Sequence, residues 1–211
     1  MPGGDSALSA RLAQALGAQW EARCNGVLIA CIGTDRSTGD SLGPITGDLL
    51  DRSAPAGVTV VGSIEDPLHA LNLEGRLTAS LATFKARPLV IAVDAALGDL
   101  RHTGGLFLTE GPLVPGSTVG KGLPGIGDIS LSGVVGPLDE EPMLTLSSIR
   151  LHLVVQMARR IDSALRGALA LSESDGQAAM SSKPSRRVSS LSGACSETNS
   201  RISGSRAWSA R

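Results

Sequence analysis

Residues 26–44 read Gly-Val-Leu-Ile-Ala-Cys-Ile-Gly-Thr-Asp-Arg-Ser-Thr-Gly-Asp-Ser-Leu-Gly-Pro, an apolar run followed by a polar loop bounded by glycines. A short continuous apolar run is typical of a strand buried on both faces of a parallel sheet, so we expect a strand over residues 26–32. Pro44 suits the first turn of a helix, which we expect over residues 44–50. The loop therefore presents Asp40 between a strand end and a helix start.

A second apolar run, Pro-Leu-Val-Ile-Ala-Val-Asp-Ala at residues 88–95, predicts a strand over 89–93 that ends at Asp94. In an open α/β sheet, ligands bind outside the carboxyl ends of strands where the strand order reverses. We expect the strands that begin at 26 and 89 to be neighbours there, so that Asp40 and Asp94 meet within hydrogen-bond or single-water reach. Two such carboxylates could share one proton or one metal ion, and both arrangements support hydrolysis. A hydrolase is the leading hypothesis.

The remaining pattern alternates between strands and helices. We expect helices over 6–23, within 66–84 and over 145–169, and strands over 58–61, 106–109 and 128–135. This βαβ-like alternation predicts a mainly parallel sheet in one α/β domain over residues 1–171. From 172 to 211 the chain is rich in serine and has no periodicity, so we expect a disordered tail.

The composition excludes several classes of protein. Of 211 residues, 42% are hydrophobic, enough for one substantial core. Aromatic residues make up 2%, with no Tyr, and the formal net charge is -1, which argues against a nucleic-acid partner. No apolar run approaches the length of a membrane span, and the three cysteines have no C-x-x-C spacing. We expect a cytoplasmic protein without a membrane partner, a disulfide framework or a thiolate metal site.

Each aspartate also has a structural explanation. Asp40 could cap the following helix, and Asp94 could be a hydrogen-bonded carboxylate at the border of the core. The loop around Asp40 nevertheless holds more polar groups than one cap requires. We therefore expect it to form a site in which Thr34, Asp35 and Arg36 contact substrate.

Two further segments can contribute to this site. His69 follows the strand over 58–61, whose carboxyl end opens on the same edge of the sheet, so we expect its side chain to border the pocket. Residues 111–127 are too rich in Gly and Pro for regular structure and can form a substrate cradle that contains Lys121.

Gly-Asp-Ser-Leu-Gly at residues 39–43 also matches the G-x-S-x-G pattern of serine hydrolases, and Ser41, Asp66 and His69 could form a triad. A nucleophile elbow, however, needs the serine on a tight strand-to-helix turn, and several polar residues separate Ser41 from the strand end. A nucleotide-binding loop is a weaker alternative, because the P-loop lysine is missing.

Several ordered motifs resemble the sporulation protein YyaC family over roughly residues 26–160. They are G-T-D-R-x-x-G-D-x-L-G-P at 33–44, D-P-L-H-A-L-N-L at 66–73, V-D-A-x-L-G at 93–98, P-G-x-x-V-G-K-x-L-P at 115–124 and G-D-I-S-L-S-G at 127–133. That family is similar to the germination (spore) protease and, more distantly, to the hydrogenase maturation peptidases. The resemblance implies a three-layer α/β/α fold with a mainly parallel sheet, of the phosphorylase/hydrolase-like kind.

The resemblance also implies a function. The catalytic aspartates of the spore protease map onto Asp40 and Asp94, which implies a peptidase acting on a peptide or protein substrate without a cofactor, in sporulating cells and their forespores. The maturation peptidases take a metal-site histidine from a later segment, and this chain has none between 103 and 151. We expect no resident metal, although His69 could take the place of that histidine from another direction. The alternative is a non-catalytic sporulation binding protein that retains the pocket.

Overall fold

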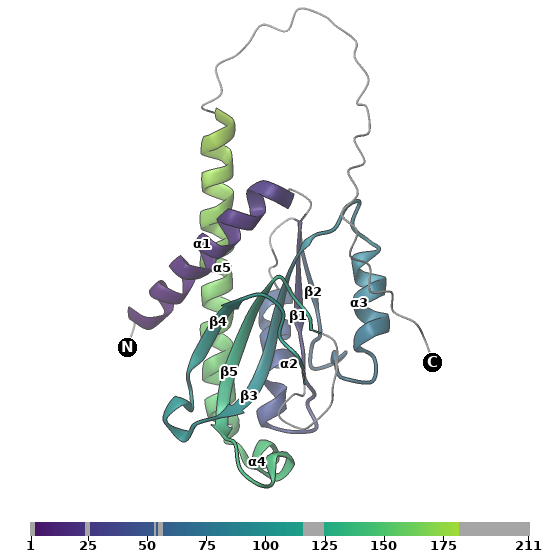
Figure 1. Cartoon of the computed structure of the whole chain (residues 1–211), viewed down its shortest axis with the longest axis vertical. Coiled ribbons are helices and arrows are strands. Elements are labelled where there is room, and N and C mark those ends of the chain that lie inside the picture. The colour runs from purple at the N-terminus through teal and green to yellow at the C-terminus, as the bar shows by residue number, and fades with distance from the viewer. Residues whose placement is uncertain (1–2, 24–25, 53, 55–56, 116–124, 182–211) are drawn as a thin grey trace, which may run out of the picture.

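The computed structural model describes residues 3–23, 26–52, 54, 57–115 and 125–181. Its regular elements, shown in Figure 1, follow one another along the chain. They are α1 (Gly3–Arg23), β1 (Val27–Cys31), the short 3-10 helix η1 (Gly39–Ser41), α2 (Leu42–Asp51), β2 (Val58–Val61), α3 (Leu73–Leu81), β3 (Leu89–Gly98), the 3-10 helix η2 (Leu100–His102), β4 (Leu106–Glu110), β5 (Ile129–Pro137), α4 (Pro142–Ser148) and α5 (Leu151–Ser181).

The five strands form one sheet in the order β2-β1-β3-β5-β4. Val27 of β1 lies opposite Val58 of β2 and opposite Leu89 of β3, and both pairings are parallel. β5 is parallel to β3, whereas β4 is antiparallel to β5. The strand order reverses between β1 and β3, as predicted from the two apolar runs, and the expectation of a mainly parallel sheet is confirmed.

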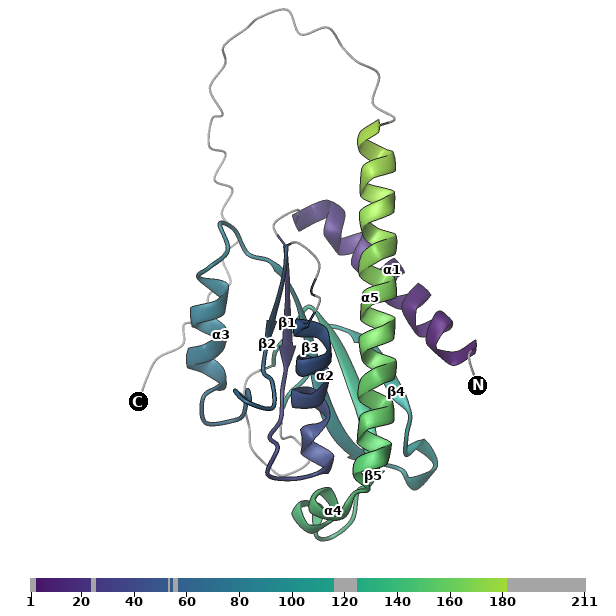
Figure 2. The same cartoon turned by 180° about the vertical axis from the view of Figure 1, so that it is seen from behind.

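Helices cover both faces of this sheet. In Figure 2, α3 lies on one side of the strands, and α1, α2 and α5 lie on the other. The same division appears in the core, where one apolar cluster joins the strands to α1, α2 and α5 and a second joins them to α3. The fold is therefore a three-layer α/β/α arrangement, as expected.

The apolar run of β3 reflects burial on both of its faces. Ile91 and Val93 belong to the larger cluster, while Val90 and Ala92 belong to the cluster under α3. Successive side chains of a strand point to opposite faces, so a strand covered on both sides needs apolar residues at every position. Asp94 is the first carboxylate in this run and lies on the face of Val90 and Ala92.

Arg166 of α5 fixes the far end of α2. One of its guanidinium nitrogens donates to the carbonyl oxygens of Leu49 and Leu50 at 2.6 and 3.3 Å, and its Nε donates to Asp162 at 2.8 Å. The last carbonyls of a helix have no partner within the helix, so a cation placed there both satisfies them and offsets the negative end of the helix dipole.

The predicted helix over 145–169 is wrong at its start, because the chain forms two helices there. Ile149, between α4 and α5, is extended with φ -60° and ψ 141°. Its side chain packs so closely on Gly39 and Gly136 that a Cβ added to either glycine would lie 3.2 or 2.5 Å from it. The extended residue between the two helices is thus the one that packs on η1 and β5.

Two other boundaries differ from those expected. β3 continues to Gly98, beyond the strand predicted over 89–93, and α5 continues to Ser181, into the segment expected to form a tail from 172. Residues 182–211 lie outside the described residues, so the division into a domain and a disordered tail stays a prediction.

Gly33 makes the tightest turn of the loop that follows β1. Its φ is +142°, and a Cβ added there would lie 2.0 Å from the carbonyl oxygen of Asp40. That oxygen accepts a hydrogen bond from the backbone N–H of Thr34 at 3.1 Å. The absence of a side chain at Gly33 therefore lets the loop close with Asp40 beside the end of β1.

We predict that Gly33→Ala destabilises the fold by about 1–3 kcal/mol, because the added methyl group must displace the backbone at Asp40. Urea denaturation followed by circular dichroism measures the change. Gly75→Ala is the matched control, since a Cβ on Gly75 of α3 meets nothing within 4 Å and alanine favours a helix. Equal stability of the two variants would contradict the close contact at Gly33.

Candidate functional site

Asp94 lies at the point where β3 continues and its neighbour β1 has ended. Cys31, the last residue of β1, is paired with Val93, and the backbone N–H of Ile32 donates to the carbonyl of Val93 at 2.7 Å. On the other side, Asp94 lies opposite Ser132 of β5. Beside Asp94, the loop that carries Asp40 therefore takes the place of a neighbouring strand.

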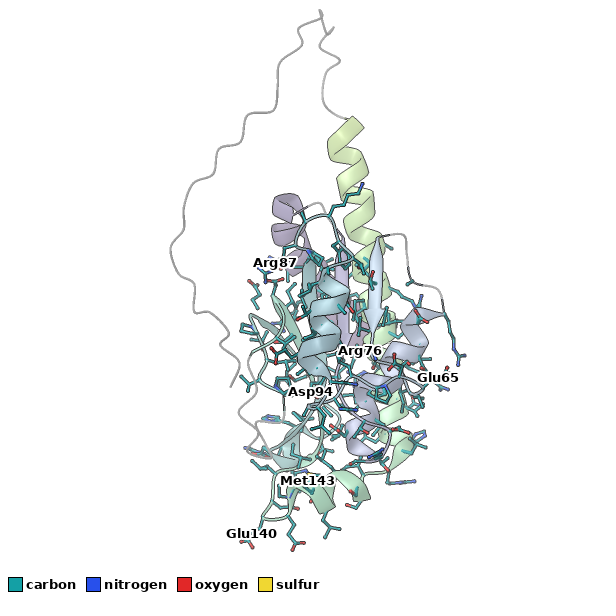
Figure 3. The ribbon with its side chains drawn as sticks, turned by 90° about the vertical axis from the view of Figure 1, so that its right-hand side faces the viewer. Glu65, Arg76, Arg87, Asp94, Glu140 and Met143 are labelled. Atoms are coloured by element: carbon teal, nitrogen blue, oxygen red, sulfur yellow. The ribbon has the colours of Figure 1, made fainter. Side chains whose placement is uncertain are left out.

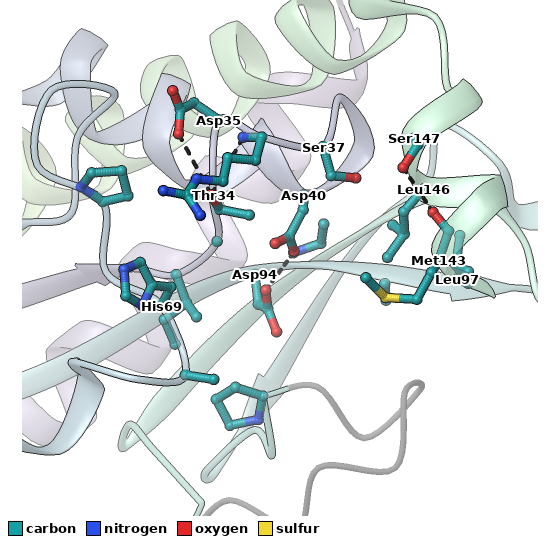
Figure 4. Close-up of a pocket in the computed structure, with 18 of the residues that line it drawn as sticks. Thr34, Asp35, Ser37, Asp40, His69, Asp94, Leu97, Met143, Leu146 and Ser147 are labelled. Atoms are coloured by element: carbon teal, nitrogen blue, oxygen red, sulfur yellow. Dashed lines mark hydrogen bonds between the residues drawn. The ribbon is translucent and has the colours of Figure 1, made fainter.

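Asp40 and Asp94 line the same cavity, which has a volume of about 860 Å³. Figure 4 shows the two side chains beside each other, with His69 on one side of Asp94 and residues of α4 on the other. The predicted meeting of the two segments at the carboxyl end of the sheet is therefore observed. Asp40 belongs to η1, and Ser41, the N-cap of α2, makes no side-chain cap hydrogen bond.

Asp94 has an unusual electrostatic environment. Burial, followed by the nearby charge of Asp40, raises the pKa of Asp94 well above its ordinary value, while a hydrogen bond from the backbone N–H of Ala95 at 2.9 Å opposes this shift. Two carboxylates in one partly dehydrated site resist double ionisation. The arrangement favours one protonated and one ionised carboxyl group.

The segment containing His69 is attached directly to this loop. The backbone N–H of Gly33 donates to the carbonyl of Leu68 at 2.9 Å, and Ile32 forms an isolated parallel bridge with Leu68. The Nδ1 atom of His69 accepts a hydrogen bond from the backbone N–H of Leu71 at 3.3 Å. An accepting Nδ1 places the proton of a neutral imidazole on Nε2.

The other residues predicted for the site fall into two groups. Thr34, Asp35 and Arg36 line the cavity together with His69. Within the loop, the Thr34 hydroxyl donates to Asp35 Oδ1 at 3.5 Å and accepts from the backbone N–H of Arg36 at 3.3 Å. Lys121 lies outside the described residues, so its expected role stays a prediction.

The serine-hydrolase alternative has no support in this geometry. Ser41 is 6% exposed, does not line the cavity in the described part of the chain, and donates from its hydroxyl to the carbonyl of Thr38 at 2.6 Å. Asp66, the proposed third member of that triad, is ion-paired with Arg76. These residues do not form a nucleophile elbow.

Sequence reasoning missed part of the wall of the cavity. The additional lining residues include Leu97, Ser132, Met143, Leu146 and Ser147, whereas Val114 belongs to the segment expected to form a substrate cradle. Ser132 belongs to a motif that the sequence does present, and its place opposite Asp94 follows from the strand register. The α4 residues had no such signal, because residues 142–148 were predicted as a loop and the beginning of one longer helix.

The described residues contain no group of three or more His, Cys, Asp or Glu side chains arranged to hold a metal ion. Cys31 is a free thiol inside the core, where burial raises its pKa. A buried thiol of this kind acts as a small apolar side chain rather than a nucleophile. Asp94, by contrast, lines the cavity and has a pKa raised by burial and a neighbouring charge.

Residues 4–164 match the family described as "Protein of unknown function (DUF1256)". The chain belongs to the DUF1256 family. This DUF1256 protein is also 40% identical over 132 residues to the uncharacterized protein YyaC of Bacillus subtilis (strain 168), which confirms the resemblance found in the motifs. That match covers 63% of this chain and 64% of YyaC, slightly less than two thirds of the relative.

Solved structures with similarity to this DUF1256 protein include two hydrogenase maturation enzymes. The [NiFe] hydrogenase maturation protease HycI from Thermococcus kodakarensis KOD1 has a TM-score of 0.48 at 16% identity, over 74% of this chain and 98% of that one. The hydrogenase maturating endopeptidase HybD from E. coli has a TM-score of 0.42 at 17% identity, over 71% and 93% of the two chains.

The helices of the described residues include none with the length and apolarity to cross a membrane.

The raised pKa of Asp94 predicts how the stability of the fold changes with pH. Because the folded state holds the Asp94 proton more tightly than the unfolded state does, this carboxyl stabilises the fold at acidic pH and loses that contribution as pH rises through its folded pKa. Asn keeps the oxygen that accepts from Ala95 and never ionises. We therefore predict that Asp94→Asn has a higher Tm than the unmodified protein at pH 8, with the difference shrinking towards pH 4.

Differential scanning fluorimetry between pH 4 and pH 8 measures this difference. Glu140→Gln is the control, since Glu140 is exposed and lies outside the cavity. A Tm difference for Asp94→Asn that is constant over this range, or that grows towards acid, would contradict a raised pKa at Asp94.

Proposed function

We propose that this protein is a peptidase that hydrolyses peptide bonds with the paired carboxyl groups of Asp40 and Asp94. The observation that carries the proposal is the shared cavity in which burial and the charge of Asp40 raise the pKa of Asp94. Such a pair supplies an acid and a base at the same pH, which is what water-mediated hydrolysis of an amide requires.

In the proposed mechanism, the ionised Asp40 accepts a proton from a water molecule while the water oxygen attacks the carbonyl carbon of the substrate. The protonated Asp94 donates its proton towards the carbonyl oxygen, where negative charge develops. The tetrahedral intermediate then collapses: the C–N bond breaks, Asp40 gives its proton to the leaving amine, and a hydroxyl group of the intermediate returns a proton to Asp94. Asp94 has the acid role because its environment holds the proton, although the pair titrates as a unit.

Neighbouring groups would position the substrate. His69 presents an Nε2–H donor if its Nδ1 remains the acceptor for Leu71, and the hydroxyl of Thr34 lies in the loop that joins β1 to Asp40. Asp35 and Arg36 are exposed at the rim and would contact the parts of a peptide that extend from the cavity. The same residues would bind a peptide if the protein does not cleave it.

The resemblance to the YyaC family and the spore protease supports a role in sporulation. The proposed substrate is accordingly a peptide or protein of the sporulating cell, hydrolysed in the cytoplasm of that cell or of its forespore. No resident metal or organic cofactor takes part in the proposed mechanism.

The proposal is tested by incubating purified protein with unstructured peptides from spore proteins and measuring cleavage by mass spectrometry. Asp40→Asn and Asp94→Asn should each reduce the cleavage rate by roughly 10²-fold or more, because either change removes one proton-transfer group. Ser41→Ala and Glu140→Gln should retain most of the activity. Loss of activity in Ser41→Ala with both aspartate variants active would overturn the proposal.

Two further results would point to the alternatives. Activity that is lost with a chelator and restored by a divalent ion would indicate a metal-dependent site. Binding of the peptides without cleavage by the unmodified protein would identify a non-catalytic binding protein that uses the same pocket.

The pH dependence of kcat/KM gives an independent prediction. Activity should fall at high pH as Asp94 loses its proton, and it should fall at low pH as the base of the pair becomes protonated, which gives a bell-shaped profile. The descending limb should begin well above the ordinary range of an aspartate because the pKa of Asp94 is raised. An activity that rises steadily with pH would instead indicate a hydroxide-like nucleophile.

A further inference from the structure

Exposed apolar side chains gather around the cavity that contains the two aspartates. Among the described residues, nine large hydrophobic side chains are exposed, and four of them line this cavity. The four are Ile64, Leu71, Val114 and Met143. They come from four separate segments of the chain, so one amphipathic element does not explain their meeting.

The structure braces Leu71 in its exposed position. Leu71 is 95% exposed, yet its backbone N–H is fixed by the hydrogen bond to His69 Nδ1. The side chain of Asn72 closes the same turn, accepting from the backbone N–H of His69 at 2.8 Å and donating to the carbonyl of Pro67 at 2.9 Å. A leucine held almost fully in water on a hydrogen-bonded turn is poised to contact a ligand.

Met143 provides an apolar group on the opposite side of the aspartates. Figure 3 places Met143 beyond Asp94 at one end of the molecule, and Figure 4 shows Asp94 between His69 and the α4 residues. Met143 is 59% exposed, whereas Leu146 of the same helix packs so closely on η1 that a Cβ at Gly39 would lie 2.9 Å from it. α4 is therefore seated on the loop of Asp40 and holds Met143 over the cavity.

The charges of the described cavity lining disfavour acidic and phosphorylated ligands. Within the described part of the chain, the lining carries four residues with carboxyl groups, Asp35, Asp40, Glu65 and Asp94, and one arginine, Arg36. An acidic or phosphorylated ligand would meet like charge there, and like-charge contacts in a binding site disfavour the wrong partner.

We propose that the cavity binds an extended polypeptide segment. This segment carries bulky aliphatic side chains on both sides of the bond held between Asp40 and Asp94, and no acidic residues beside that bond. Ile64, Leu71, Val114 and Met143 determine this specificity by covering those side chains. An extended chain projects successive side chains in opposite directions, which suits apolar contacts on two sides of the aspartate pair. This inference rests on the proposed function, because it names the substrate class of the same site.

The test separates binding from cleavage by using the Asp94→Asn variant for binding. Four fluorescent twelve-residue peptides share one Gly/Ser frame and carry a central pair of Leu, Ser, Lys or Asp residues. Fluorescence anisotropy at pH 7 should give the Leu peptide a Kd roughly tenfold or more below that of the Ser peptide, and the Asp peptide the weakest binding. Equal affinity for the Leu and Ser peptides, or the tightest binding by the Asp peptide, would overturn the inference.

Two variants on α4 test the role of the exposed apolar residues around the cavity. Met143→Ser, made in the Asp94→Asn background, should weaken binding of the Leu peptide about three- to tenfold and leave the Ser peptide unaffected. Leu144→Ser is the matched control, since Leu144 is 63% exposed on the same helix and does not line the cavity. Leu71→Ser should act as Met143→Ser does. Equal effects of the Met143 and Leu144 variants would contradict the inference.

Cleavage by the unmodified protein distinguishes the two proposals. Preferential binding of the Leu peptide without cleavage supports the substrate class and overturns the peptidase function. Cleavage of all four peptides at similar rates supports the peptidase and overturns the apolar specificity. Neither binding nor cleavage of any peptide overturns both.

Discussion

The position of the site depends on close backbone packing at the carboxyl end of β1. Gly33 leaves room for the carbonyl of Asp40, and Gly43 approaches Ile32 so closely that an added Cβ would lie 2.0 Å from the Ile32 carbonyl oxygen. These contacts let the polar loop turn back over the strand end and let α2 begin directly beside it. Without them, Asp40 could not reach the space next to Asp94, where β3 extends beyond its neighbour.

Burial of the Asp94 carboxyl group within β3 is unfavourable in free energy. Strand positions 89–93 are apolar because both faces of the sheet are covered, and a carboxylate in the same strand must be paired, hydrogen-bonded or protonated. The hydrogen bond from Ala95 supplies part of this compensation, and the nearby charge of Asp40 acts in the opposite direction. A stable fold would favour an apolar residue here, and the proposed function gives the carboxyl group at this position a role.

The sequence predicted the sheet and the aspartate pair more accurately than the wall around them. Apolar runs and glycine-bounded loops are local signals, and the strand over 58–61 and the position of Asp40 and Asp94 on one cavity followed from them. The predicted distance between the two carboxyl groups stays a prediction. The break between α4 and α5 has no local signal, since neither Gly nor Pro stands there. At this break Ile149 packs against Gly39 and Gly136, which are distant in the chain, and Met143 of the preceding helix lines the cavity.

α4 and the turn at residues 66–72 lie outside the sheet, although both line the cavity. The groups that would perform chemistry are held by β1, β3 and the glycine contacts between them. The exposed apolar residues around the cavity, Ile64, Leu71, Val114 and Met143, form the apolar rim and lie outside these strands. Under the proposed specificity, substitutions in the rim would alter which polypeptide is accepted and leave the geometry of the carboxyl pair unchanged. In the proposed peptidase, ligand preference could therefore change through the rim alone while the carboxyl pair stays in place.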